Sequence, residues 1–220
     1  MNADFIIRRL PRRSISLHIH NDGVLEVRAP RFVPEFVIRR FVDSKRDWIE
    51  NTKRRLSALP KSKKIKYQEG EIFRLGGVDY ALHITDGNAI VLTPTKLFFP
   101  KKFLAKPKIH MEAFCRKFAK QFLADRLAIY AKKMGVTYKR VSIRDTTSRW
   151  GSCSSSGTIS FSYRLILAEL TIIDYVLIHE LAHITHPHHR LSFWARVGAF
   201  YPEYAIARTR LRKEGDSFKI

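Results

Sequence analysis

Two histidines and a glutamate in the C-terminal third of the chain have the spacing of a catalytic metal site. They occur in the run His179-Glu180-Leu181-Ala182-His183. Residues four apart on a helix lie on one face, so both imidazoles can bind the same metal ion. Glu180 projects about 100° round the helix from His179, where it can reach a water on that ion. The run therefore predicts metal-assisted hydrolysis with Glu180 as the general base.

A catalytic zinc usually has three protein ligands and one water, so a third ligand must follow the helix. The candidates are His186, His188, His189 and Glu203. If the helix continued, position 189 would lie about 9 Å along its axis from His183, too far to share an ion. Pro187 opposes such a continuation, because it lacks an N–H and disfavours helical geometry at the residue before it. We expect the chain to turn and bring back His189, with Glu203 as the alternative.

The residues around the motif predict the elements that position it. Residues 172–185 are apolar on most sides, which is typical of a buried helix. Thr171 and Asp174 resemble a capping box at the start of this helix, with the hydroxyl serving the first amides. Strands are predicted at 141–144 and 158–161.

The preceding part of the chain is predicted to be rich in short strands. Alternation in 14–19 and 24–28 indicates a β-hairpin, and the period then changes to a helical face within 41–59. The further segments expected to form strands are 71–75, 78–84 and 89–93. A long helix should occupy 107–134, where Gly135 would end it.

Composition limits the class of protein and its compartment. The chain has 220 residues, of which 45% are hydrophobic, enough for one domain or one with an appended subdomain. No apolar run approaches the roughly 18 residues of a membrane span, and the first ten residues lack a secretory apolar core. Cys115 and Cys153 are too few for a disulfide framework, which fits a reducing compartment. We expect a cytoplasmic protein without a membrane partner.

The charge of the chain is strongly basic and unevenly distributed. Lys and Arg total 41 against 20 Asp and Glu, which gives a net charge of +21. Residues 1–70 and 71–140 carry +9 each, residues 141–220 carry +3, and 60–64 form a basic linker. Such a field attracts phosphates, nucleic acid or acidic surfaces. Nucleic acid is therefore a candidate partner of the N-terminal region, and a role in solubility alone is the alternative.

Several runs in the C-terminal part resemble a known family. They are Arg149–Ser154, Arg164–Ala168, Ile173–Tyr175, the His179–His183 motif, and His189 with Phe193 and Trp194. Together they resemble the YgjP-like, SprT-type zinc metallopeptidases, and the first hairpin and the helix near 44–48 do so more loosely. This resemblance implies a zincin-like fold, zinc bound by His179, His183 and His189, and Glu180 as general base. In such a fold the strand at 158–161 would border the active-site cleft, where an edge strand can take an extended peptide. It leaves the substrate open, because members are linked to peptide cleavage and to nucleoside triphosphate hydrolysis.

The sequence as a whole predicts an α+β fold in two parts. Residues 101–220 are expected to form a zincin-like metallopeptidase core, and residues 1–100 a basic, β-rich region with one helix. The leading function is Zn²⁺-dependent peptide hydrolysis through a zinc-bound water that Glu180 activates. The alternatives are a metal-dependent nucleoside triphosphate pyrophosphohydrolase and a basic nucleic-acid-binding module with a structural zinc. The last is disfavoured, because structural zinc sites are normally closed by four protein ligands.

Three residues near the motif have no role that the sequence alone assigns. Arg149 precedes the turn before the second predicted strand. Cys153 is a packed thiol or a fourth zinc ligand. Tyr204 is a candidate donor to an oxyanion.

Overall fold

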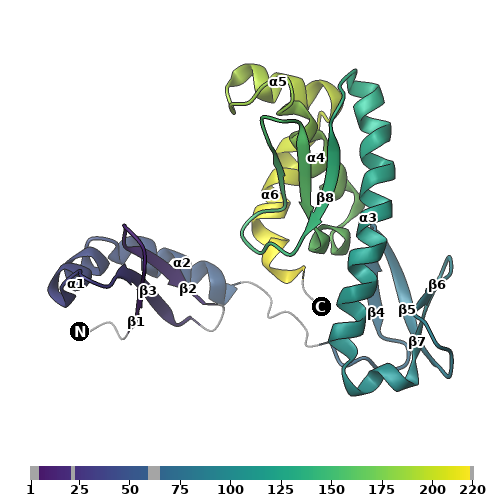
Figure 1. Cartoon of the computed structure of the whole chain (residues 1–220), viewed down its shortest axis with the longest axis horizontal. Coiled ribbons are helices and arrows are strands. Elements are labelled where there is room, and N and C mark those ends of the chain that lie inside the picture. Colours follow the sequence, from purple (N-terminus) through teal and green to yellow (C-terminus); the bar gives the residue numbers. More distant parts are fainter. Residues whose placement is uncertain (1–4, 21–22, 59–64, 219–220) are drawn as a thin grey trace. The chain divides into compact units, whose positions relative to one another are not determined.

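The chain forms two compact units, residues 1–61 and 62–220. The computed structural model describes residues 5–20, 23–58 and 65–218, so the basic linker at 60–64 lies outside the described residues (Figure 1). The sequence predicted a division at residue 100, and the units divide earlier. The physical reason is packing, because the strands between 72 and 100 share one apolar core with the helix that follows them.

The N-terminal unit is a three-stranded sheet with two helices. Its strands are β1 (Phe5–Leu10), β2 (Ser16–Ile19) and β3 (Leu25–Pro30), and its helices are α1 (Glu35–Asp43) and α2 (Arg46–Ala58). The strand order is β1-β3-β2, in which β3 pairs antiparallel with β2 and parallel with β1. The predicted hairpin is confirmed, and β1 was not predicted, because its sequence, Phe-Ile-Ile-Arg-Arg-Leu, does not alternate between apolar and polar residues.

Alternation along β3 separates the two faces of this sheet. Leu25, Val27 and Ala29 are buried on one face against Ile38 of α1 and Ile49 of α2. The single helical face predicted over 41–59 is wrong in part, since the helix breaks between α1 and α2. The Ser44 hydroxyl donates to the carbonyl of Phe41 at the break, and Trp48 is half exposed rather than buried.

The second unit begins with a four-stranded sheet. Its strands are β4 (Ile72–Leu75), β5 (Val78–Thr85), β6 (Val91–Leu92) and β7 (Lys96–Pro100), in the order β4-β5-β7-β6. The three predicted strands are confirmed, and β7 is additional. Gly76 and Gly77 join β4 to β5 with positive φ angles of 61° and 86°, which glycine adopts without a steric penalty. A short 3-10 helix, Lys101–Ala105, leads to the long helix.

The long helix α3 (Pro107–Met134) is the element that both layers of this unit share. Its bounds match the prediction, with proline at the first position and Gly135 in the left-handed conformation at the end. The side chains that α3 buries recur at every fourth position: Met111, Cys115, Ala119, Leu123, Leu127 and Ala131. Figure 1 shows the first half of α3 beside β4 and β5 and its second half beside β8 and α4. One apolar face therefore unites both layers.

The C-terminal layer is a second sheet followed by helices. Its elements are β8 (Arg140–Arg144), β9 (Gly151–Cys153), β10 (Thr158–Ser162), a 3-10 helix (Tyr163–Leu167), α4 (Leu170–Ala182), α5 (Leu191–Phe200), α6 (Tyr204–Glu214) and a 3-10 turn (Gly215–Ser217). The strand order is β8-β10-β9, with β9 antiparallel to β10. Both predicted strands are confirmed. The expectation that the second strand borders the cleft is wrong, because β10 is central and β9 forms the edge beside α4.

Helix α4 is buried along nearly its whole length. It begins at Leu170 without a side-chain cap, so the predicted capping box is wrong. Asp174 instead receives hydrogen bonds from the guanidinium of Arg126 on α3, and Glu169 pairs with Arg210 of α6. Carboxylates at its start thus fasten α4 to two neighbouring helices. Among the described helices, none combines the length and apolarity that a membrane span requires.

The Arg126–Asp174 pair should contribute measurably to stability. Replacing Asp174 by alanine leaves a half-buried guanidinium without its carboxylate, so we expect the free energy of unfolding to fall by about 2 kcal/mol. Urea denaturation measures this loss. Lys108→Ala, which removes an exposed pair with Glu112 on α3, is the matched control and should change stability little. Equal losses in the two variants would contradict the assigned role.

Candidate metal centre

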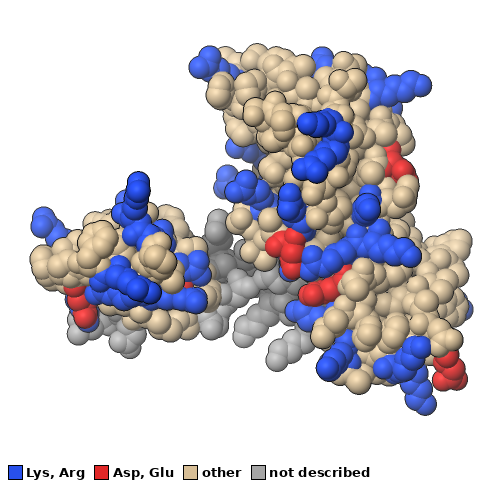
Figure 2. Space-filling view, viewed as in Figure 1, with Lys and Arg blue, Asp and Glu red and all other residues tan. Residues whose placement is uncertain are grey.

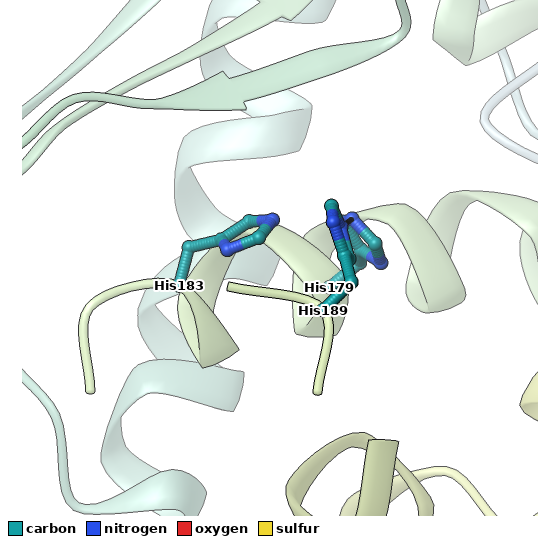
Figure 3. A group of neighbouring side chains, drawn as sticks. All are labelled: His179, His183 and His189. Carbon is teal, nitrogen blue, oxygen red and sulfur yellow. Dashed lines mark hydrogen bonds between the residues drawn. The ribbon is translucent and has the colours of Figure 1, made fainter. Parts of the chain in front are cut away.

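Three imidazoles converge at the C-terminal end of α4. His179 lies in the last turn of the helix, His183 follows its last residue, and His189 lies in the segment before α5. Their potential ligand nitrogens all lie within 4.8 Å of one another. Figure 3 shows the ring of His183 pointing towards the rings of His179 and His189. Among the described residues, this is the group of metal-ligating side chains that the fold assembles.

One pair of these nitrogens has the separation expected at a tetrahedral zinc ion. Zinc–nitrogen bonds of 2.0–2.1 Å at tetrahedral angles place two ligand nitrogens about 3.3 Å apart. The Nε2 atoms of His179 and His189 lie 3.1 Å apart. Three histidines also leave a fourth position free for water, as catalytic zinc sites do. The donor set therefore suits a catalytic metal.

The chain returns His189 to the helix by ending α4 early. Regular α-helix stops at Ala182, and the amide of His186 still donates to the carbonyl of Ala182 at 2.9 Å. Pro187 follows and cannot donate a further helical hydrogen bond. The turn brings His189 to the other two histidines, while His186 and His188 remain outside the group. Glu203, the other candidate ligand, also lies outside the group, at the start of α6.

Hydrogen bonds at Nδ1 orient two of the three imidazoles. Nδ1 of His183 lies 3.2 Å from the carbonyl oxygen of His186, so this nitrogen carries the proton and donates. Nδ1 of His179 lies 3.5 Å from the hydroxyl of Tyr175, one turn earlier on α4. Both contacts leave Nε2 free to bind a metal, which is how outer groups orient ligand histidines.

Aromatic side chains of α5 and α6 support the third histidine. Trp194 stacks on His189 with 5.6 Å between ring centroids, and Phe193 is fully buried against all three imidazoles. Tyr204 also stacks on Trp194, with an interplanar angle of 17°. The guanidinium of Arg208 lies 4.5 Å from the centroid of Trp194. The segment that carries His189 is therefore packed against a layered aromatic support.

Burial sets the protonation states of the motif. It lowers the pKa of His179 to about 3, with a smaller contribution from His183 and His189. The pKa of His183 is lowered for the same first reason. Both imidazoles are thus neutral at physiological pH, the form that binds metals. Burial raises the pKa of Glu180 to about 8, and the charge of Arg149 opposes this rise.

Gly151 is a site residue that sequence reasoning missed. It lies in the edge strand β9, where a Cβ atom would be 2.5 Å from Oε1 and 2.7 Å from Cγ of Glu180. Only a residue without a side chain allows the strand to lie this close to the carboxylate. The available signal was a glycine inside a short strand, which often marks such a close approach.

Three other residues that the sequence left without a role, Cys153, Arg149 and Tyr204, lie outside the histidine group. Cys153 is half-buried in β9 and does not join the histidine group, and burial raises the pKa of its thiol, followed by the charge of Glu180. Arg149 is exposed on the loop before β9. Tyr204 has its ring committed to stacking on Trp194.

Comparison with known proteins identifies the family. The model of the YgjP-like metallopeptidase domain matches residues 13–214. The chain belongs to this family. A solved structure, the metallopeptidase zymogen of Pyrococcus abyssi abylysin, is 26% identical, with coverage of 44% of this chain and 99% of that chain and a TM-score of 0.40. No curated protein matches the chain.

Membership in the YgjP-like family accords with both the fold and the site. The α+β architecture contains the zincin-like metallopeptidase core that the sequence predicted. The matched residues include every element from β2 to α6, and thus both the histidine group and β9. Most of the N-terminal unit, from β2 onwards, is therefore part of the match.

Metal content tests the histidine group directly. Protein loaded with zinc and desalted should retain about one ion per chain by elemental analysis. His189→Ala should lose the ion as fully as His179→Ala, because either change removes one of three ligands. His188→Ala is the matched control and should keep it. Retention of stoichiometric zinc by His189→Ala would remove this residue from the ligand set.

Gly151→Ala should impair peptide cleavage without changing metal binding. The new methyl group displaces Glu180, and misplacement of a catalytic group by about 1 Å costs on the order of 100-fold in rate. We therefore expect unchanged zinc content with a loss of peptide cleavage of that order. Gly87→Ala, whose Cβ would meet nothing closer than 3.5 Å, is the control. Wild-type cleavage by Gly151→Ala would show that Glu180 tolerates the shift.

Proposed function

We propose that this protein is a zinc-dependent peptidase whose ligands are His179, His183 and His189 and whose general base is Glu180. The observation that supports it best is the convergence of three imidazoles, one of which, His179, is adjacent in sequence to the buried carboxylate of Glu180. When bound, zinc lowers the pKa of a coordinated water towards about 7 and polarises the target carbonyl. Three protein ligands leave the fourth coordination position open for this water, which disfavours a purely structural zinc.

Glu180 is proposed to move the proton during cleavage. Its carboxylate accepts a proton from the attacking water as the water oxygen bonds to the carbonyl carbon. The same oxygen then gives the proton to the departing amide nitrogen, so the C–N bond breaks to yield an acid and an amine. Close packing of Gly151 against the carboxylate holds it in one orientation, and pre-organisation of this kind saves reorganisation in the transition state.

The edge of β9 is proposed to hold the substrate. Backbone hydrogen bonds from Ser162 to Trp150 and from Ser154 to Thr158 show which residues of this hairpin bond inward. Because alternate residues of an antiparallel strand bond to opposite sides, the amides and carbonyls of Gly151 and Cys153 point outward. An extended peptide can add to this edge as a further antiparallel strand. Its scissile bond would then lie beside α4 and Glu180.

Glu180→Gln tests the proposed base. The amide is nearly isosteric but cannot accept the proton, so we expect full zinc content and a loss of nearly all peptide hydrolysis. Cleavage can be followed by mass spectrometry on a pool of unstructured peptides, with nucleoside triphosphates as the competing substrate class. Glu203→Gln is the control and should cleave like wild type. Preferred hydrolysis of triphosphates by wild type, abolished in Glu180→Gln, would replace peptidase by pyrophosphohydrolase.

A further inference from the structure

The N-terminal sheet has one face that the helices of its unit do not cover. Leu25, Val27 and Ala29 pack on the helical side, so Glu26 and Arg28 of β3 point to the other face. Register places Arg8 of β1 beside Arg28, and Ser16 of β2 on its other side. We propose that this face, carrying Arg8, Arg12 and Arg28, binds the phosphate backbone of single-stranded nucleic acid.

The three arginines form a row across the sheet. Neighbouring strands lie about 4.8 Å apart, so Arg8 and Arg28 are adjacent in the row. Nη1 of Arg12, from the segment between β1 and β2, donates to the hydroxyl of Ser16 at 2.7 Å. That hydrogen bond brings the third guanidinium to the far end of the same row. The row therefore offers planar donors to successive phosphates of a strand that crosses it.

The positive charge of this row is largely uncompensated. Among the described residues, Glu26 is the carboxylate on this face, and it accepts from Arg28 and contacts His20. Within the same part of the chain, no carboxylate pairs with Arg8 or Arg12. Nε of Arg12 is buried and has no hydrogen-bond partner. Figure 2 shows Lys and Arg side chains over much of the visible surface of this unit, with few Asp or Glu.

The shape and chemistry of the face favour a single strand of nucleic acid. A three-stranded sheet is broader than the two-stranded ribbon that fits the major groove of a duplex, whereas unstacked bases can lie on such a face. Ile6 is 57% exposed next to Arg8 and offers an apolar contact to a base. Among the described residues, Ile6 is the exposed large apolar side chain on this face. One such side chain offers too little apolar surface for insertion into a lipid bilayer. The phosphates supply the affinity and the bases add contact area.

Fluorescence anisotropy of the full-length protein with a labelled 20-residue oligo-deoxythymidine tests this proposal. Three phosphate contacts predict a salt dependence with a slope near −2 in log K against log salt, at about −0.7 per contact. Arg8→Glu should weaken binding by about 10-fold at low salt and flatten the slope. Arg8→Gln should do so to a smaller extent. Lys53→Glu on α2 makes the same change in net charge away from the face, and should have under about a twofold effect.

Three results would overturn the proposal. Equal weakening by Arg8→Glu and Lys53→Glu would reduce the interaction to net charge without a site. Equal affinity for a duplex of the same length would exclude a face selective for single strands. Binding to phosphatidylglycerol vesicles without binding to the oligonucleotide would make the surface a membrane contact. Circular dichroism of each variant confirms that the unit remains folded, which the exposure of Arg8 and Lys53 favours.

Discussion

The requirement that three imidazoles meet at one point governs the C-terminal unit. Two of them are given by helical spacing, but the third lies six residues further on and cannot arrive along a helix. The helix must therefore stop at Ala182, and the chain must be held in its return to His189. Phe193 and Trp194 of the next helix provide that hold through direct ring contacts with the histidines. Helix α5 thus packs directly against the histidine group.

Deep burial of α4 serves both stability and chemistry. Its apolar sides lie in the core, so its polar groups must be compensated individually, and Asp174 and Glu169 are paired with arginines of α3 and α6. Glu180 and His179 meet the same low-dielectric surroundings without such a partner, and their pKa values shift in opposite directions. Burial disfavours both charged forms, so it favours the neutral imidazole of His179 and raises the proton affinity of the Glu180 carboxylate. A helix placed elsewhere would not give this pair of properties.

Sequence reasoning succeeded where the signal is local and failed where the partner defines the element. The bounds of α3 follow from its proline, its glycine and its four-residue apolar period. The histidine motif is likewise readable, because its geometry is contained in one turn of helix. In contrast, β9 is three residues long and exists because β10 pairs with it. The importance of Gly151 could not be inferred without knowing that α4 packs against β9. The position of Asp174 near the start of α4 suggested a helix cap, but its carboxylate binds Arg126, which is 48 residues away in sequence.

The net charge of the chain is +21, and the extent to which its arginines are paired with carboxylates differs between the two units. In the C-terminal unit many arginines are committed to carboxylates that join elements, as in Arg126–Asp174, Arg210–Glu169 and Arg116–Asp145. Such pairs neutralise their own charge and contribute little to the distant field. On the face of the N-terminal sheet opposite its helices, three arginines share one carboxylate, which pairs with Arg28, so among the described residues Arg8 and Arg12 have no carboxylate partner. Ion pairing, rather than composition, therefore determines where a polyanion would find uncompensated positive charge.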